Sequence, residues 1–115
     1  VHDSIFLNKA VAYVEANLNN PNYTVEQLSK DLCMERSGLY KKLNNLMDKS
    51  PSLFIRSIRL KRAANLILEG KMSISEIAEQ VGFSSASYMG KCFIEEYHCK
   101  PSEYAILHKT KGTPR

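Results

Sequence analysis

The side chains with the clearest chemical potential in this sequence are cationic, and they gather in one stretch. Residues 36–62 carry eight Lys or Arg residues against the single acid Asp48, a net charge of +7, whereas residues 1–35 have a net charge of −3. Cations at this density suit an anionic partner such as a phosphate backbone. A solvated helix face is the ordinary alternative for a run of charge, so the elements that carry these residues must decide between the two interpretations.

The other reactive residue types do not form a recognisable catalytic or metal-binding pattern. Cys92, His98 and Cys99 lack the spacing of zinc ligands. The chain has three cysteines, the third being Cys33, and this odd number favours reduced thiols. The other two histidines lie near the chain ends, and no glycine-rich phosphate loop, paired carboxylates or Ser/His/Asp order stands out. We therefore predict no catalytic residues, no bound metal and no cofactor. The chain shows neither a membrane-length apolar run nor a signal peptide, so we expect a cytoplasmic location. It starts with Val-His and not with Met, so we expect it to be a piece of a longer protein.

The elements that must position the cations are helices. Apolar residues recur at steps of three and four over residues 7–18, and no strand-like alternation is visible in the sequence. The start and stop signals are two capping boxes, a proline-started helix and a terminal glycine: Thr24 with Gln27, Ser73 with Glu76, Ser50-Pro51, and Gly70. These patterns predict an all-α fold of about seven helices.

One unit of this pattern occurs twice. Residues 24–34 align with residues 73–83 at an offset of 49, and after the following turn the offset becomes 50, which pairs Pro51 with Pro101. Each unit reads as a helix, a tight turn, a helix and a proline-started helix. The domain boundaries that follow are a first subdomain, a linker helix, a second subdomain and a flexible basic tail: 1–50, 51–70, 71–109 and 110–115.

The tight turns indicate two helix-turn-helix motifs. Such helices cross steeply and need a small residue at the crossing, which Ser29 and Ala78 supply. Gly82 provides the positive φ that the second turn needs, whereas its counterpart Cys33 either carries a strain of about 1 kcal/mol or adopts another geometry. A plain helical hairpin would explain one such motif. Two copies in register favour the helix-turn-helix interpretation.

The segment "ISEIAEQVGFSSASYMGKCFIEEYHCKPSEY" (74–104) carries a family resemblance. From about residue 5 to residue 105, the chain resembles the DNA-binding domain of AraC/XylS-type transcription regulators, departing at His98 and Asp48, where glycine is usual. The stretches "FLNKAVAYVEANLNN" and "LYKKLNNLMDKSPSLFIRSIRLKRAANLILEGK" further resemble the output domain of Bacteroides-type hybrid two-component regulators. This resemblance implies a parent anchored in the inner membrane and a partner in RNA polymerase. It implies no small-molecule ligand and no membrane contact for this fragment.

The resemblance also implies a double-stranded DNA partner, with the second helix of each motif in the major groove and the two segments about one turn (~34 Å) apart. Positions left outward by the leucine stripe are the base-reading candidates: Arg36, Ser37, Tyr40, Lys41 and Asn44 in the first motif, and Ser85, Ala86, Ser87, Gly90 and Lys91 in the second. The phosphate-contact candidates are basic residues outside this set: Lys42, Arg56, Arg59 and Lys100.

The two predicted reading helices differ in the side chains that they offer. The first has donors that fit base edges, whereas the second offers mainly Ser, Ala and Gly. We therefore expect the first helix to dominate base readout and the second mainly to contact the DNA backbone and recognise DNA shape. Arg59 and Arg62 have an equally weighted alternative as internal ion pairs. Tyr88 is expected to pack as core, with a phosphate contact as its alternative role. The rival function classes are a helical protein–protein adaptor, which requires an exposed apolar patch, an RNA-binding module, which requires stacking aromatics, and an enzyme.

Overall fold

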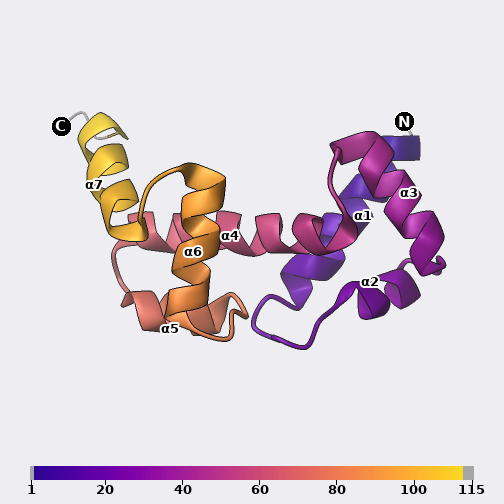
Figure 1. Cartoon of the computed structure of the whole chain (residues 1–115), viewed down its shortest axis with the longest axis horizontal. Helices are drawn as coiled ribbons and strands as arrows, with labels where there is room; N and C mark the ends of the chain where they lie inside the picture. The colour runs from indigo at the N-terminus through magenta and orange to yellow at the C-terminus, as the bar shows by residue number, and fades with distance from the viewer. Residues whose placement is uncertain (1, 113–115) are drawn as a thin grey trace. The chain divides into compact units, whose positions relative to one another are not determined.

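A computed structural model describes the backbone of residues 2–112 and the side chains of residues 2–108. The described residues form seven α-helices and no strand, which confirms the predicted all-α class (Figure 1). Their bounds are α1 (His2–Ala16), α2 (Val25–Asp31), α3 (Arg36–Met47), α4 (Pro51–Glu69), α5 (Ile74–Gln80), α6 (Ala86–Tyr97) and α7 (Pro101–Gly112). Over these residues, none of the helices combines the length and the apolar character that crossing a bilayer would require.

Two compact units divide the chain between Arg59 and Leu60, inside α4. The division follows the apolar residues of α4, because Phe54 and Ile55 belong to the first core and Leu60 and the residues after it to the second. The boundaries predicted at residues 50 and 70 stay a prediction. Residues 110–112 of the predicted tail belong to α7, and residues 113–115 lie outside the described residues.

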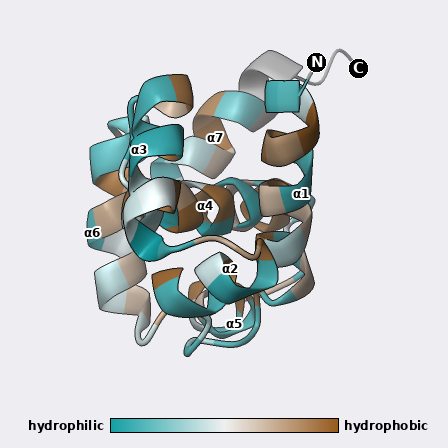
Figure 2. Cartoon of the chain, turned by 90° about the vertical axis from the view of Figure 1, so that its right-hand side faces the viewer, coloured by the Kyte–Doolittle hydropathy of each residue, from teal (hydrophilic) through white to brown (hydrophobic). Residues whose placement is uncertain are grey.

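The first unit is built on apolar residues from four helices. α1, α2 and α3 are amphipathic, with hydrophobic and hydrophilic residues interspersed along each (Figure 2). α1 ends at Ala16, and Leu18 follows it in a turn and still packs against the core. The buried members of this core are Ala10, Val14, Tyr23, Leu28, Leu39, Leu43, Phe54 and Ile55.

The second unit has its own core, centred on α6. Met89 and Phe93 are fully buried, and Phe93 is flanked by the rings of Tyr97 and Tyr104 at centroid distances of 4.5 and 5.3 Å. Burial raises the pKa of Tyr97 above its ordinary value, and the neighbouring Tyr104 and Glu96 add to the shift. This cluster joins α6 to α7 and fixes the side of α6 that faces inward.

The helix ends confirm most of the predicted signals and correct one. Ser73 and Glu76 form the expected capping box, and Gly70 follows α4 with a φ of 70°. Thr24 is the N-cap of α2, but its side chain makes no capping hydrogen bond, so the capping box predicted there was wrong. Its intended partner Gln27 instead donates from Nε2 to Oδ1 of Asp31 at 3.4 Å.

Candidate nucleic-acid interface

The turn between α2 and α3 and the turn between α5 and α6 have the same backbone geometry. In the first, Cys33 has a φ of 58° and the amide of Met34 donates to the carbonyl of Ser29 at 2.9 Å. In the second, Gly82 has a φ of 83° and the amide of Phe83 donates to the carbonyl of Ala78 at 2.9 Å. Cys33 therefore adopts the left-handed conformation of its glycine counterpart, at the steric cost that a β-carbon carries there.

The small residues predicted at the helix crossings are buried as expected. Ser29 is 3% exposed and Ala78 is 2% exposed. The hydroxyl of Ser29 donates to the carbonyl of Val25 at 2.8 Å, which satisfies the one polar group that serine adds to this contact. Both motifs are thus built as the sequence predicted, and each presents its second helix as a 12-residue element.

The outward face of α3 is open along its length. The inward residues Leu39 and Leu43 are fully buried, which leaves the opposite side of the helix in solvent. All five base-reading candidates of the first motif are exposed: Arg36, Ser37, Tyr40, Lys41 and Asn44. This face combines guanidinium, ammonium, amide and hydroxyl groups within three turns, a set that can address base edges in a major groove.

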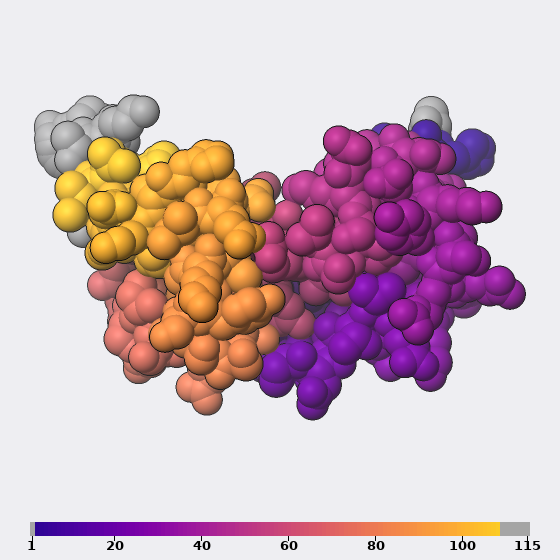
Figure 3. Space-filling model, in the orientation of Figure 1, coloured from indigo at the N-terminus to yellow at the C-terminus, as the bar shows by residue number. Residues whose placement is uncertain are grey.

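The outward face of α6 is smaller in its side chains and less fully exposed. Its helix lies at the surface of the second unit (Figure 3). Ser85, Ser87 and Lys91 are exposed, whereas Gly90 is half-buried and Ala86 packs in part against the core. The Ser85 hydroxyl oxygen accepts from the Tyr88 amide at 3.0 Å, so it also serves as the N-cap of α6.

Tyr88 is not the core residue that the sequence favoured. It is 48% exposed, and its ring meets the edge of Phe83 at a centroid distance of 5.8 Å. Its position in the first turn of α6 leaves it next to the candidate readers Ser85 and Ser87. Tyr88 is therefore accessible to a partner, and the phosphate contact expected as its alternative role stays a prediction.

Arg59 is a correction to the predicted phosphate contacts. It is only 6% exposed, and its guanidinium donates to three backbone carbonyls, those of Leu18, Asn20 (3.0 Å) and Tyr23 (3.4 Å). Burial lowers the pKa of Arg59 from its ordinary value. The side chain is thus used to hold the connection between α1 and α2, and it is not available to DNA.

Tyr23 extends this anchor to α2. It is 4% exposed, and its hydroxyl donates to Oδ2 of Asp31, the last residue of α2, at 2.7 Å. Burial and the hydrogen bond to Asp31 raise the pKa of Tyr23 well above its usual range. The hydrogen bonds of Arg59 thus connect α4 to the segment between α1 and α2. The hydrogen bond of Tyr23 to Asp31 connects that segment to the end of α2, shortly before α3.

The remaining phosphate-contact candidates differ in how accessible they are. Lys100 is exposed immediately before α7, and Arg56 is half-buried on α4. Lys42 is half-buried, and its ammonium lies 4.8 Å from the centroid of the Phe6 ring, a cation–π contact between α3 and α1. A phosphate contact by Lys42 would require its ammonium to leave that ring.

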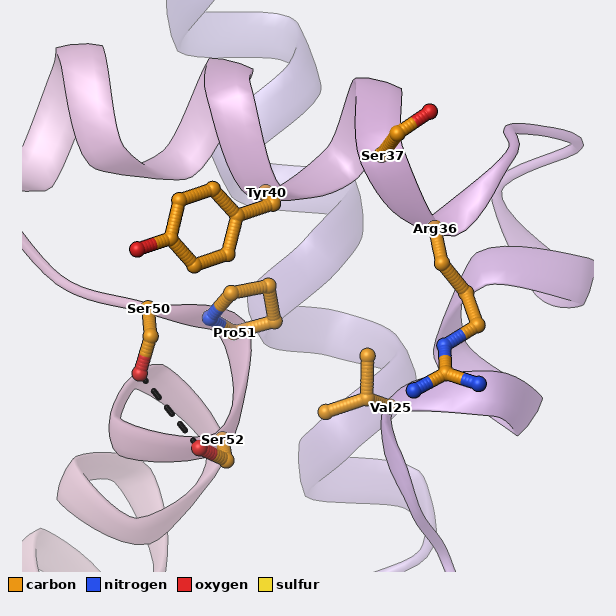
Figure 4. A pocket seen from close by; sticks show the side chains of 7 residues that line it. All are labelled: Val25, Arg36, Ser37, Tyr40, Ser50, Pro51 and Ser52. Atoms are coloured by element: carbon orange, nitrogen blue, oxygen red, sulfur yellow. Dashed lines mark hydrogen bonds between the residues drawn. The ribbon is translucent and has the colours of Figure 1, made fainter.

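An open hollow of about 590 Å³ lies beside α3 in the first unit (Figure 4). Arg36 and Tyr40 enter it from α3, near Val25 and Pro51, whereas Ser37 points away from it. The hydroxyls of Ser50 and Ser52 lie 3.3 Å apart at the start of α4. Hydroxyl and guanidinium donors around an open hollow suit an anionic oxygen.

The sequence analysis did not single out Ser50 and Ser52, which line this hollow, because it interprets Ser50 as the cap of the helix that begins at Pro51. The amide of Leu53 does donate to the Ser50 hydroxyl oxygen at 3.3 Å. The pattern of two hydroxyl residues around Pro51, directly after the basic helix, was the available signal. A residue that caps a helix can also line a surface.

Comparison with known proteins identifies a family that matches most of this chain. The family described as "Helix-turn-helix domain" matches residues 28–105. Over 102 residues the chain is 40% identical to histidine kinase P4 of Formosa agariphila, covering 89% of this chain and 7% of that protein. It is 29% identical over 98 residues to the HTH-type transcriptional regulator AlkR of Acinetobacter baylyi, covering 85% of this chain and 32% of that protein. The chain therefore spans a third or less of the length of these relatives.

A solved structure supports the same grouping. The crystal structure of a DNA-binding transcriptional dual regulator from Escherichia coli K-12 matches with a TM-score of 0.77 and 27% identity. The match covers 89% of this chain and 90% of that chain. The all-α fold, and not only the local motif, is thus similar to that of the Escherichia coli protein.

Proposed function

Because this chain belongs to the AraC family of helix-turn-helix DNA-binding domains, a family of transcription regulators and not of enzymes, we propose that α3 and α6 enter successive segments of the major groove of its DNA target. An α-helix fits that groove, and helix-turn-helix motifs place their second helix in it. One observation carries the proposal. The two helices have equal length, begin 50 residues apart and expose Ser37 with Lys41 and Ser87 with Lys91 at equivalent positions.

We propose that hydrogen-bonded base readout resides mainly in α3. Arg36 and Asn44 are exposed on one face, and Arg fits guanine O6 and N7 as Asn fits adenine N6 and N7. Lys91 in α6 is a compact point charge suited to a phosphate. Phosphate contacts set the register of the protein on DNA, and base contacts set the preferred sequence.

We propose in addition that this domain is the output part of a longer sensor protein. The similarity to a small portion of a histidine kinase supports a parent of the two-component type. Such a parent would be anchored in the inner membrane and would act on transcription through RNA polymerase.

Two matched substitutions test the proposed division between the reading helices. Lys41→Ala should weaken binding to the preferred site by about 1–3 kcal/mol and relax the preference at one or two base pairs. Lys91→Ala should weaken all sequences by a similar factor and reduce the salt slope by about 1, because a phosphate contact is the same at every base pair. Selection from a random DNA pool followed by binding isotherms measures both effects.

Lys9→Ala is the control, since Lys9 is exposed on α1 and lies outside both motifs. It should leave the preferred sequence unchanged. If Lys91→Ala changes the preferred base while Lys41→Ala leaves preference intact, the assignment of roles is wrong. If the chain selects no sequence from the pool, sequence-specific recognition by these helices is wrong as a whole.

A further inference from the structure

The two reading helices match at some outward positions and differ at others. Residues 50 apart are equivalent, since α3 and α6 begin at residues 36 and 86 and both are followed by a left-handed residue, Asp48 and His98. Serine and lysine recur at equivalent places in both helices. At three other outward positions a polar or aromatic residue of α3 has a small or apolar equivalent in α6: Ala86 for Arg36, Gly90 for Tyr40, and Ile94 for Asn44.

These three residues of α6 form one stripe. Ala86, Gly90 and Ile94 are four residues apart, which places them above one another on the same face of the helix. Ile94 is 43% exposed, so its side chain reaches the surface and is not needed to fill the core. The stripe ends on an apolar side chain that solvent now covers, and it adjoins Lys91 of the proposed DNA-binding face.

Gly90 has no internal reason to be glycine. A β-carbon added at this position would meet no atom within 4 Å other than those of its chain neighbours and of the nearby backbone of its own helix, and the backbone there is ordinary helix without a positive φ. Glycine inside a helix destabilises it relative to alanine. The use of glycine here is therefore best explained by something outside the protein that approaches the backbone of α6 closely.

We infer that the stripe of Ala86, Gly90 and Ile94 reads thymine by apolar contact with its C5-methyl group, an inference that rests on the proposed function. Thymine is the base whose major-groove edge carries a methyl group, and alanine and other apolar side chains contact it. The absent side chain of Gly90 lets the helix approach the base edges closely. The stripe offers no donor to guanine O6 or N7, so guanine there would lose hydrogen bonds with water without replacement. α6 thus adds thymine readout to its hold on the backbone.

Replacing thymine by deoxyuridine tests this directly, because it removes the methyl group and keeps the base pair and the O4 acceptor. The full chain and its selected site are used, with one thymine replaced at a time. Each contacted methyl should contribute about a fourfold change in affinity, since a buried methylene is worth about 0.8 kcal/mol and a tenfold change about 1.4 kcal/mol. Ethylation interference locates the half of the site that α6 binds. Ethylation of a phosphate that Lys91 contacts should weaken binding of the unaltered chain but not of Lys91→Ala.

Paired variants assign the effect to the stripe. Ile94→Ala should abolish the uracil effect at one position, whereas Asn44→Ala, the equivalent change on α3, should leave that effect in place. Gly90→Ala should weaken binding at least fivefold without lowering the melting temperature, because the protein has room for the added carbon. Gly38→Ala on α3 is its control, since a β-carbon there meets only the Met34 side-chain end at 3.8 Å.

The outcomes separate the inference from the function beneath it. A selected site whose affinity changes less than 1.5-fold at every thymine-to-uracil replacement in the α6 half overturns thymine readout and leaves the DNA-binding proposal standing. A selected α6 half without thymine, or Gly90→Ala with unchanged affinity, overturns it equally. Absence of any selected sequence means that the proposed function itself has failed.

Discussion

Arg59 is the residue whose replacement we expect to affect the first unit most. Its guanidinium is buried and donates to the carbonyls of Leu18, Asn20 and Tyr23, which lie 36 to 41 residues earlier in the chain. It therefore joins α4 to the connection that leads into α2, and α2 packs against α3. Arg59→Met keeps most of the aliphatic stem and removes every one of these donors.

The size of the effect follows from which carbonyls water can reach. An unsatisfied buried acceptor costs about 1–3 kcal/mol. Asn20 is exposed, so water can replace the guanidinium there, whereas Leu18 is half-buried and Tyr23 is buried. Relief of the desolvated charge offsets part of the loss, and we expect a decrease of about 2–4 kcal/mol in the free energy of unfolding. A unit of 59 residues has only about 3–9 kcal/mol in total, so α3 would lose much of its support.

Hydrogen exchange is the assay that localises this loss. Amides of α1, α2 and α3 should lose protection in Arg59→Met, while those of α5 and α6 should keep it, because stability is not uniform across such a structure. Arg62→Met removes an exposed arginine from the same helix and should change stability by no more than about 0.5 kcal/mol. A decrease below 0.5 kcal/mol for Arg59→Met, or equal loss of protection in both units, would refute the reasoning.

Three further predictions concern salt, backbone strain and pH. The charge of +7 on residues 36–62 implies several phosphate contacts, so the logarithm of the affinity for DNA should fall by ~0.9 per contact against the logarithm of salt concentration, and isotherms insensitive to salt would contradict it. Cys33→Gly should stabilise the first unit by about 0.5–1 kcal/mol in urea unfolding and Gly82→Ala should destabilise the second by about 1 kcal/mol or more, because both positions have a positive φ; equal effects of one sign would show that strain is not the cause. Burial and the hydrogen bond to Asp31 raise the pKa of Tyr23 in the folded state. The contribution of Tyr23 to the free energy of unfolding should therefore be complete below about pH 10 and should decline at higher pH by up to ~1.4 kcal/mol per pH unit. Tyr23→Phe, followed by exchange or unfolding probes in the first unit, should remove that decline.

The repeat made much of the fold predictable. An offset of 49 before the turn and 50 after it placed two helix-turn-helix motifs in register, and the structure gives both motifs the same turn hydrogen bond and the same helix length. Apolar spacing decided which side of α3 and α6 faces inward, because burying the stripe at Leu39 and Met89 leaves a defined opposite face. The outward residues of α3 were predictable for the same reason.

Sequence analysis misassigned polar residues of two kinds. Some have hydrogen-bond partners far away in the sequence, and others have a second possible partner nearby on the same helix. Arg59 belongs to a basic run and resembles its neighbours in sequence, and nothing near it indicates carbonyl acceptors around residue 20. Thr24 and Gln27 have the spacing of a capping box, but Gln27 has a second partner in Asp31 one helical turn further on. Periodicity identifies the buried side of a helix, whereas the partner of a polar side chain depends on tertiary contacts.

The difference between α3 and α6 has a consequence for the DNA site. A helix-turn-helix dimer applies one reading surface twice, so its site mirrors the symmetry of the protein. This chain repeats the backbone of the motif and has Ser and Lys at equivalent positions of α3 and α6. At two other equivalent positions the helices differ, with Tyr40 and Asn44 in α3 and Gly90 and Ile94 in α6. Because the duplicated units are covalently joined, each surface can carry its own chemistry without the other. The selected site should therefore be non-palindromic, with donor-read purines in the half bound by α3 and thymines in the half bound by α6; a selected palindrome would mean that the two helices contribute alike.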